Sequence, residues 1–188
     1  MKKLVHTDPD WEQIQKCSQG DNDAIERLYL RFAPIIFAIG IRYFQNQEVA
    51  QDLTHDCFIK ILGKLHRYKP NGSFYGWVKR ICINQIIDQI RKEKKFKHIE
   101  KLNDEDLLWI EESPQEESPP TKIQLDRFIA RLPEQKRIIF NLYYIEQLSH
   151  RDIAKQLGIK EKTSSSLLYK ARQLLTKWIQ DEQLEKDY

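Results

Sequence analysis

The sequence is poor in glycine, methionine and cysteine, and it lacks a long apolar run. Its three cysteines, Cys17, Cys57 and Cys82, are widely spaced and form no CxxC, so neither a disulfide framework nor a zinc site is expected. The longest apolar stretch, residues 34–41, is far too short to span a bilayer, and no apolar core of a signal peptide follows Met1. We therefore expect a cytoplasmic protein with reduced, buried thiols and no direct membrane insertion.

Patterns of catalytic residues are missing as well. The five histidines are scattered without metal-ligand spacing, and neither a glycine-rich phosphate loop nor H-E-x-x-H occurs. Asp52, His55 and Asp56 share one face of an expected helix and could be mistaken for a metal site, but an exposed interaction face is the better interpretation. The sequence thus predicts no enzyme activity, no cofactor and no metal.

Charge is distributed unevenly along the chain, although the net charge is only +3. Residues 60–98 contain eleven Lys or Arg and two acidic residues, whereas residues 100–118 contain eight Asp or Glu and one Lys. A basic block followed by an acidic block is typical of a polyanion site beside a segment that repels or mimics polyanions. For each run taken alone, a solvated charged surface is the alternative.

Apolar residues recur at three- and four-residue steps, as in amphipathic helices, and no alternating strand pattern of useful length occurs. The stripes are Ala24, Ile25, Leu28, Phe32, Ile35, Ile36 and Ile39; Val49, Leu53, Cys57, Phe58, Ile61, Leu62 and Leu65; Trp77, Val78, Ile81, Cys82, Ile86, Ile87 and Ile90; and Leu125, Phe128, Ile129 and Leu132. Pro34 interrupts the first stripe. Asn46 and Ser73 are expected to cap the second and third helices, and Pro133 to take the first position of a later one.

A linker divides the chain. From about residue 103 to residue 120 the sequence is acidic and contains three prolines, and both features disfavour a packed helix. We predict an all-α fold of two small helical domains, residues 8–97 and 121–182. An acidic flexible linker over residues 98–120 would join them, and the C-terminal domain would contain a helix-turn-helix.

The sharpest local pattern begins at Ser149, which can cap a short helix together with Asp152 in its first turn. Ala154 is small where two helices must cross closely, and Gly158 suits a tight turn. A long helix then starts near Glu161. This arrangement is typical of a DNA-binding helix-turn-helix, with an ordinary helical hairpin as the alternative.

The second of these helices would read the DNA. The candidate contact residues are Lys162, Thr163, Ser165, Ser166, Tyr169, Lys170 and Arg172, with Arg151 on the preceding helix. Hydroxyls can reach bases or phosphates, and cations contribute counterion-release affinity. Because serines outnumber arginines here, the module should bind duplex weakly by itself and need a second DNA contact or a protein partner.

The N-terminal domain offers such a contact. Three aromatics lie within residues 73–77, and cations follow, with Lys94 and Lys95 expected on the same helix. Aromatic rings among cations suit unpaired bases, and the loop of residues 69–73 could hold an extruded base. Simple core packing of the aromatics is the alternative, and the two interpretations remain equally open for Trp77.

Taken together, these segments resemble the extracytoplasmic-function (ECF) sigma factors, which direct bacterial RNA polymerase to promoters. Residues 51–62 resemble the family's polymerase-binding helix, and residues 73–88 with the following basic run resemble its promoter-melting and −10 recognition helix. The pairs Leu132-Pro133, Leu148-Ser149, Ile153-Ala154, Leu157-Gly158 and Ala171-Arg172 match its −35 reading domain. The resemblance covers nearly the whole chain in the same order, and it implies a sigma factor that binds core polymerase and recognises and helps to melt promoter DNA.

The resemblance also implies roles for particular residues. Those that would dock on the clamp helices of the largest polymerase subunit are Gln51, Asp52, His55, Asp56 and Lys60. Those that would capture or stabilise −10 DNA are Lys69, Asn71, Ser73, Trp77, Lys79, Arg80, Asn84 and Arg91. The reading-helix candidates and Arg151 would contact the −35 element.

Further partners follow from the same resemblance. They are the flap of the second-largest polymerase subunit and an anti-sigma factor, often membrane-anchored, which would hold the chain at the inner membrane. The free chain is expected to be a monomer. Its acidic linker would lie in the positively charged RNA path of the polymerase and mimic nucleic acid.

One departure from the family pattern concerns the reading helix. Family members commonly have Gly-Thr-Val-Arg-Ser-Arg where this chain has Lys162-Thr-Ser-Ser-Ser-Leu167, so both arginines are replaced, by Ser165 and Leu167. The −35 sequence of typical members is therefore not expected here. The other functions considered are a dimeric DNA-binding regulator, for which no dimer seam is visible, and a nucleic-acid enzyme, for which no active site is visible.

Overall fold

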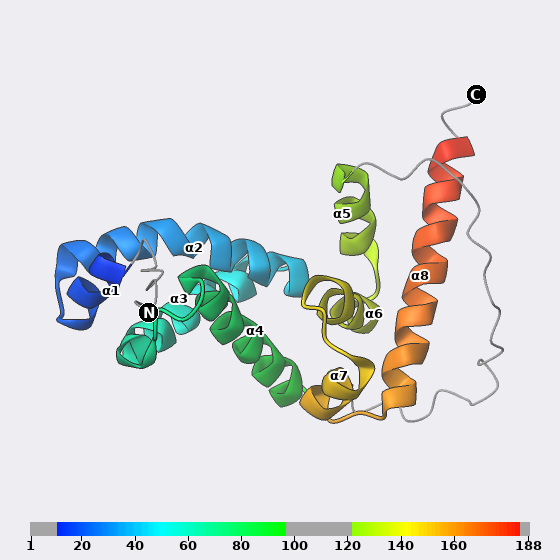
Figure 1. Cartoon of the computed structure of the whole chain (residues 1–188). Coiled ribbons are helices and arrows are strands. Elements are labelled where there is room, and N and C mark those ends of the chain that lie inside the picture. Colours follow the sequence, from blue (N-terminus) through cyan, green and yellow to red (C-terminus); the bar gives the residue numbers. More distant parts are fainter. Residues whose placement is uncertain (1–10, 97–121, 185–188) are drawn as a thin grey trace, which may run out of the picture. The chain divides into compact units, whose positions relative to one another are not determined.

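A computed structural model describes residues 11–96 and 122–184, and within these two ranges every regular element is a helix (Figure 1). The all-α prediction is thereby confirmed. The chain divides into two compact units, residues 1–89 and residues 90–188, which are treated separately below. None of the described helices is both long and apolar enough to cross a membrane. The predicted linker, residues 98–120, lies outside the described residues.

Three helices of the first unit contain the predicted apolar stripes, whereas its first helix, α1 (Trp11–Ser18), was not predicted. The three are α2 (Asn22–Phe44), α3 (Gln47–Lys64), which the short 3-10 turn η1 (Leu65–Arg67) follows, and α4 (Phe74–Lys92), whose last residues belong to the second unit. The predicted cap of α3 is confirmed, because the Asn46 side chain accepts a hydrogen bond from the Val49 backbone N–H at 3.1 Å. Pro34 lies inside α2, which continues through it.

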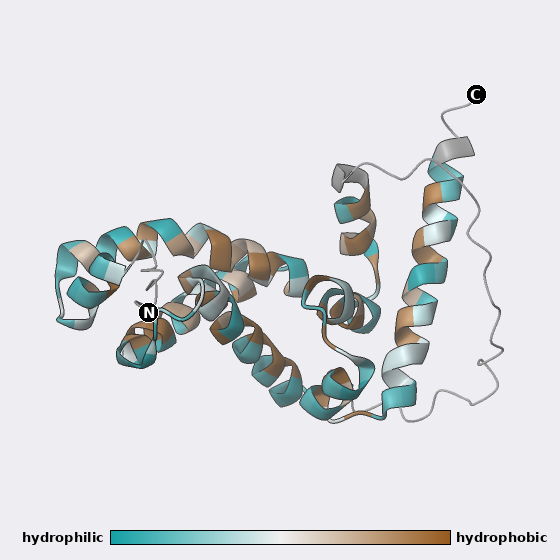
Figure 2. Cartoon of the chain, viewed as in Figure 1, coloured by the Kyte–Doolittle hydropathy of each residue, from teal (hydrophilic) through white to brown (hydrophobic). Residues whose placement is uncertain are grey.

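The helical hairpin of α2 and α3 forms the frame of the first unit. Gly40 lets the two helices approach closely, since a Cβ at this position would lie 3.0 Å from the Ala50 Cβ. Edge-to-face ring contacts fill the core, with centroids 5.3 Å apart for Phe32 and Phe74 and 4.9 Å for Tyr29 and Phe58. Figure 2 shows the hydrophobic positions that supply this packing, alternating with hydrophilic ones along each helix.

The second unit is built around one long helix. Its elements are α5 (Lys122–Arg131), α6 (Glu134–Phe140), the π-helical turn η4 (Asn141–Ile145), α7 (His150–Leu157) and α8 (Glu161–Leu184). Helices α5, α6 and α7 all pack against α8. Pro133 is the residue before the first turn of α6 and not its first helical residue as predicted; its ψ of 140° is extended.

The helix-turn-helix geometry is as predicted. The Ser149 hydroxyl oxygen accepts from the Asp152 backbone N–H at 3.1 Å and donates to the Asp152 carboxylate at 2.6 Å, which fixes the start of α7. Gly158 ends α7 with φ of 71°, in the left-handed region that glycine adopts without strain. These two local features set where α7 begins and where the chain turns into α8.

Candidate nucleic-acid and protein interfaces

The first candidate surface is the outer face of α3. All five predicted docking residues, Gln51, Asp52, His55, Asp56 and Lys60, are exposed there. The opposite face of α3 is buried against the unit, because the residues at helical spacing between them are apolar. The structure therefore brings the five predicted side chains together on one accessible helix surface.

Ile59 is an apolar residue on this surface that the sequence-based prediction did not include. Its side chain is 68% exposed, and it lies three, four and seven residues after Asp56, His55 and Asp52, so all four residues share one helix face. The signal was present in the sequence, since Ile59 lies outside the apolar stripe of its helix. A large apolar side chain amid charged ones is typical of an interface centre.

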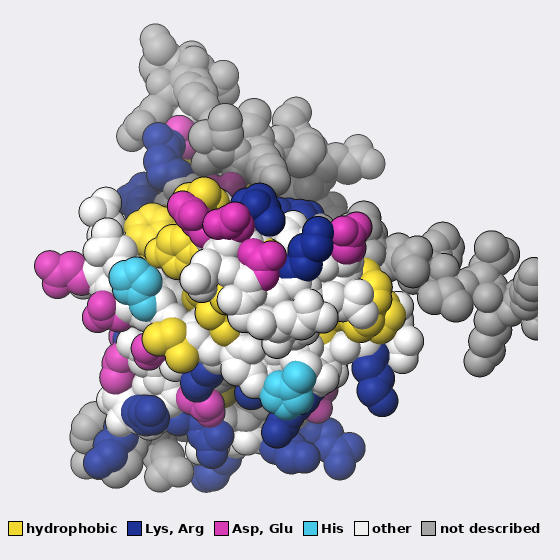
Figure 3. Space-filling view, turned by 90° about the vertical axis from the view of Figure 1, so that its left-hand side faces the viewer, with side chains coloured by type: hydrophobic (Ala, Val, Ile, Leu, Met, Phe, Trp, Pro, Cys, Tyr) yellow, Lys and Arg dark blue, Asp and Glu magenta, His cyan; other side chains and the backbone are white. Residues whose placement is uncertain are grey.

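Leu30 on α2 is another strongly exposed apolar residue among the described residues of the first unit, at 64%. Leu30 and Ile59 each follow one partner of the Tyr29–Phe58 ring contact, so they lie at the same level of the hairpin. Figure 3 shows one face of the molecule on which hydrophobic side chains are exposed among acidic and basic ones.

Helix α4 restrains two of the predicted docking residues. The Gln85 side chain accepts a hydrogen bond from the Lys60 ammonium and donates one to the Asp56 carboxylate at 3.5 Å. Gln85 is half-buried, so it holds both charged groups near one position. Sequence reasoning missed Gln85 because the contact joins residues that are 25 or more positions apart.

The second candidate surface comprises the loop before α4 and one face of that helix. Lys69, Asn71 and Ser73 are exposed. The loop is held by two hydrogen bonds, from the Tyr68 hydroxyl to the Gly72 carbonyl at 2.7 Å and from the Asn71 N–H to the Lys69 carbonyl at 2.7 Å. Three polar side chains are therefore presented on an ordered loop.

Along α4, four of the predicted residues share one face. Trp77, Arg80, Asn84 and Arg91 follow one another at steps of three, four and seven residues, which is the repeat of one helix side. Lys79 is displaced by about 200° around the helix from Trp77 and does not join them. Asp88, four residues after Asn84, lies on the same face. The surface therefore also contains a carboxylate, which the number of charges in residues 60–98 could not locate.

Trp77 packs against the aromatic core of the first unit, and its role in binding a base stays a prediction. Its ring stacks on the buried ring of Phe74, with centroids 5.5 Å apart and planes 21° apart, and contacts the ring of Tyr68 edge-on. Yet Trp77 is only half-buried. Packing against Phe74 and Tyr68 therefore fixes the ring, while part of the Trp77 residue stays accessible.

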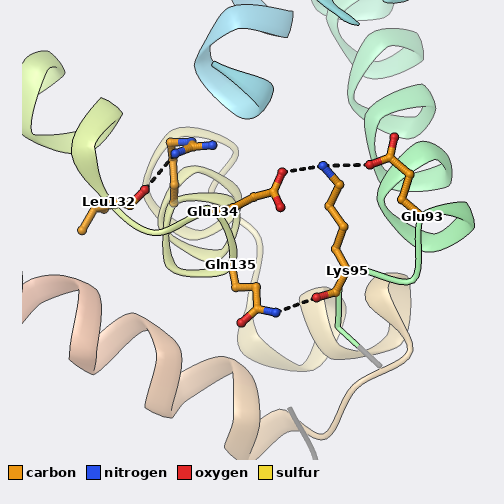
Figure 4. Close-up of polar contacts among 6 residues, drawn as sticks. Glu93, Lys95, Leu132, Glu134 and Gln135 are labelled. Carbon is orange, nitrogen blue, oxygen red and sulfur yellow. Dashed lines mark hydrogen bonds and ion pairs between the residues drawn. The ribbon is translucent and has the colours of Figure 1, made fainter. Parts of the chain in front are cut away.

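Two cations that were expected on α4 lie beyond its end. The helix ends at Lys92, and Lys94 has φ of 55°, which a continuing helix cannot accommodate. Within the second unit, the Lys95 ammonium pairs with Glu134 and with Glu93, and the Gln135 side chain donates to the Lys95 carbonyl at 2.6 Å (Figure 4).

These contacts commit Lys95 to the protein. Burial alone would lower its pKa, but the hydrogen bonds from its ammonium to Glu134 and Glu93 more than offset that effect, so the pKa of Lys95 is raised above its ordinary value. A cation held by two carboxylates is a poor phosphate ligand. Lys95 is therefore not counted among the residues of the second candidate surface.

The third candidate surface is the outer side of α8 with the start of α7. Arg151, Lys162 and Arg172 are exposed, and the other predicted residues, Thr163, Ser165, Ser166, Tyr169 and Lys170, are half-exposed. On α8, the side opposite the buried stripe of Ser164, Leu168 and Ala171 carries Lys162, Ser166, Tyr169 and Lys170, and the margins of that stripe carry Thr163, Ser165 and Arg172.

One hydrogen bond and one buried side chain reduce the number of polar groups that this surface offers to a ligand. The Ser165 hydroxyl donates to the Lys162 backbone carbonyl at 3.1 Å, so its hydrogen is already used within the helix. Leu167, at one of the positions where the related motif has arginine, is only 3% exposed. In this chain that position belongs to the core.

Two family models match this chain. Residues 28–96 match the family model described as Sigma-70 region 2, and residues 122–175 match Sigma-70, region 4. The RNA polymerase sigma-H factor of Pseudomonas aeruginosa is 26% identical over 94% of this chain and 97% of its own length. The ECF RNA polymerase sigma factor SigW of Bacillus subtilis is 26% identical over 90% of this chain and 96% of its own. A solved structure of CnrH in complex with the cytosolic domain of CnrY, 19% identical, gives a TM-score of 0.46 over 93% of this chain and 99% of that one.

Proposed function

The chain belongs to the ECF sigma factors of bacterial RNA polymerase and directs promoter-specific transcription initiation, and on that premise we propose how its three surfaces divide the work. The observation that carries the proposal is the order of the surfaces along one chain. A protein-type surface with an apolar centre precedes a loop and helix suited to unpaired bases, and a helix-turn-helix follows. The protein performs no catalytic chemistry of its own in this scheme.

The outer face of α3 docks on the clamp helices of the largest polymerase subunit. Ile59 is the apolar centre of this contact, and Asp52, His55 and Asp56 surround it with groups that pair with polar or basic residues of the partner. Interfaces of this kind place a desolvated anchor inside a polar rim. Gln85 supports the arrangement by holding Asp56 and Lys60 before the partner arrives.

The loop of residues 69–73 and the face of α4 that carries Trp77 bind the −10 element. The polar groups of the ordered loop take a base that has left the duplex, and the half-buried Trp77 supports the melted strand. Arg80, Asn84 and Arg91 contact the sugar-phosphate backbone from the same helix face. Lys79 contributes only long-range charge, because it points to another side.

The outer side of α8 reads the −35 element from the major groove. Its hydroxyl-rich surface and few arginines support weak, polymerase-dependent binding, and its base preference differs from that of arginine-bearing relatives. The flap of the second-largest subunit supports this unit. The acidic linker follows the RNA path of the polymerase.

Control of the free chain completes the proposal. We assign the free chain to the cytoplasm as a monomer that an anti-sigma factor sequesters. If this inhibitor is anchored in the inner membrane, it holds the chain there. Membership of the ECF sigma factors supports this step, and so does the exposure of the α3 face around Ile59. An inhibitor that covers this face would block core binding.

One reconstitution tests the whole assignment. The full chain is mixed with core RNA polymerase and a promoter library, and run-off transcription is measured together with core affinity. We expect nanomolar core binding and initiation from a defined subset of promoters, with weak duplex binding by the chain alone. Tight duplex binding without core affinity or transcription would favour a free-standing DNA regulator and overturn the proposal.

A further inference from the structure

The two helices of the helix-turn-helix meet through a polar contact. His150 is the first residue of α7 and Ser164 lies in the first turn of α8, and the imidazole Nδ1 is 2.9 Å from the Ser164 hydroxyl oxygen. Ser164 is 0% exposed, so water does not reach its hydroxyl. In the related motif this position is valine, which cannot form such a bond.

Tyr143 fixes the other side of the same imidazole. The two rings are stacked, with centroids 4.7 Å apart and planes 24° apart. Tyr143 lies in the π-helical turn η4, where the Glu146 N–H bonds to the Asn141 carbonyl five residues before it. One inserted residue rotates the side chains that follow by about 100°, and such π-turns are frequent at functional sites.

The surroundings of the imidazole favour its neutral form. Burial lowers the pKa of His150, against the smaller opposing effect of the Glu161 carboxylate. A neutral imidazole has one N–H donor and one acceptor nitrogen, so Nδ1 and the Ser164 hydroxyl can pair in either direction. The ring therefore connects η4, α7 and α8 without placing a charge among them.

We propose that His150 is a positioning residue for −35 recognition: held between Tyr143 and Ser164, it sets the orientation of the first turn of α8. Thr163 and Ser165 adjoin Ser164 and belong to the predicted DNA contacts, so a tilt of this turn displaces both. The idea rests on the proposed role of α8 as the −35 reader. It explains how a reading surface with few arginines retains selectivity, since short hydroxyl side chains tolerate little misplacement.

A double-substitution cycle in the reconstituted holoenzyme tests the proposal. The readout is −35 discrimination, defined as the affinity ratio for a promoter selected by the unchanged chain and the same promoter with a scrambled −35 element. His150→Ala and Ser164→Val should each lower this ratio roughly tenfold, and the double variant should lower it no further, because both remove one bond. The salt slope of binding should not change, since no phosphate contact is lost.

Two further variants separate positioning from general stability. His150→Asn should recover part of the discrimination, because its amide can bond to the Ser164 hydroxyl. Lys155→Ala, an exposed position on α7, is the matched control and should combine additively with Ser164→Val. If His150→Ala does not fold, the cycle is closed with His150→Phe and Ser164→Val, because phenylalanine keeps an aromatic ring beside Tyr143 and removes the ring nitrogen.

The outcomes distinguish this inference from the proposed function. Additive losses in the His150–Ser164 cycle, or unchanged discrimination, would overturn the inference while leaving the −35 role of α8 intact. A smaller salt slope in His150→Ala would mean that His150 contacts phosphate itself, which also contradicts a positioning role. If the holoenzyme of the unchanged chain ignores the −35 sequence, the proposed function fails and the inference fails with it.

Discussion

The outer face of α3 and the outer side of α8 are both exposed sides of amphipathic helices, yet their chemistry differs. On α3 a 68%-exposed isoleucine is surrounded by charged groups, two of which are held by a side chain of another helix. On α8 the exposed side consists of hydroxyls and a few cations, and one hydroxyl is already bonded to its own helix. The first surface suits a protein partner with lasting contact, and the second suits DNA held in place by other interactions.

The difference teaches where affinity and selectivity reside in this protein. A desolvated apolar anchor with oriented charges supplies binding free energy, whereas short hydroxyls supply little affinity and depend on accurate placement. The α3 face should therefore dominate holoenzyme formation. The α8 face should change which promoters are used without changing how tightly core polymerase is bound.

The largest expected effect is on core binding. Asp52→Arg combined with Asp56→Arg should weaken core affinity by about a thousandfold, because like charges facing a partner cost several kcal/mol. Fluorescence titration of labelled chain with core polymerase measures it. Asp126→Arg combined with Asp181→Arg, the same charge change at exposed positions of the second unit, is the control. Equal losses in both double variants would show a net-charge effect and no docking face.

An arginine introduced at position 167 of α8 should destabilise the fold, whereas an arginine at position 165 should not. Leu167→Arg places a cation at a 3%-exposed site and should lower the free energy of unfolding by about 3 kcal/mol, seen in urea titration. Ser165→Arg, at a half-exposed neighbouring position, should leave stability nearly unchanged and strengthen duplex binding. A stable Leu167→Arg with tighter duplex binding would show that Leu167 faces the DNA.

Ile59→Asp tests the apolar centre of the α3 face. Core affinity should fall about thirtyfold, roughly 2 kcal/mol, as for a central anchor, while the unfolding midpoint stays the same because the side chain is exposed. Leu30→Asp, on α2 and similarly exposed, is the comparison variant. If the Ile59→Asp chain binds core normally, Ile59 does not contribute to the interface, and the charged groups form it without an apolar centre.

Lys170→Ala should have a smaller effect that is confined to DNA. We expect about fivefold weaker −35 duplex binding and a salt slope reduced by about one, because one phosphate contact is lost. Core affinity should be unchanged, which separates the two surfaces. A constant slope would remove Lys170 from the set of phosphate contacts.

The smallest expected effect concerns pH. Because burial lowers the pKa of His150 in the folded state, the unfolded chain takes up its proton first as pH falls. The stability associated with neutral His150 is thus fully present above the unfolded value of about 6.5 and declines as pH falls from there toward the folded value. His150→Asn should flatten this part of the curve in urea titrations between pH 7.5 and pH 5. An unaltered slope would mean that other groups produce it.

Much of this architecture could be predicted from local patterns. The caps at Asn46 and Ser149 and the turn at Gly158 depend on residues a few positions apart, so the sequence contains the whole interaction. Other features could be seen only in the tertiary structure. Gln85 and His150 act through residues 25 and 14 positions away, and no periodicity relates them to their partners.

The end of α4 illustrates the same limit. Lys and Arg have good individual helix propensities, and the helix was expected to continue through them, but Lys95 bonds to residues 39 and 40 positions later and leaves the helical path. By contrast, the loss of two arginines from the reading motif was visible in the sequence. The burial of Leu167 and the accessibility of Ser165 also agree with the apolar spacing of the helix.

By itself, the sequence determined the all-α fold, the caps at Asn46 and Ser149, the turn at Gly158 and the resemblance to a family, because these depend on spacing and on short-range hydrogen bonds. Only the tertiary structure decided which exposed residues act together. It placed Gln85 beside Asp56 and Lys60, and His150 between Tyr143 and Ser164. The reason is physical, since side-chain pairing between helices depends on their approach and rotation, which the packing of the whole core sets and no local pattern encodes.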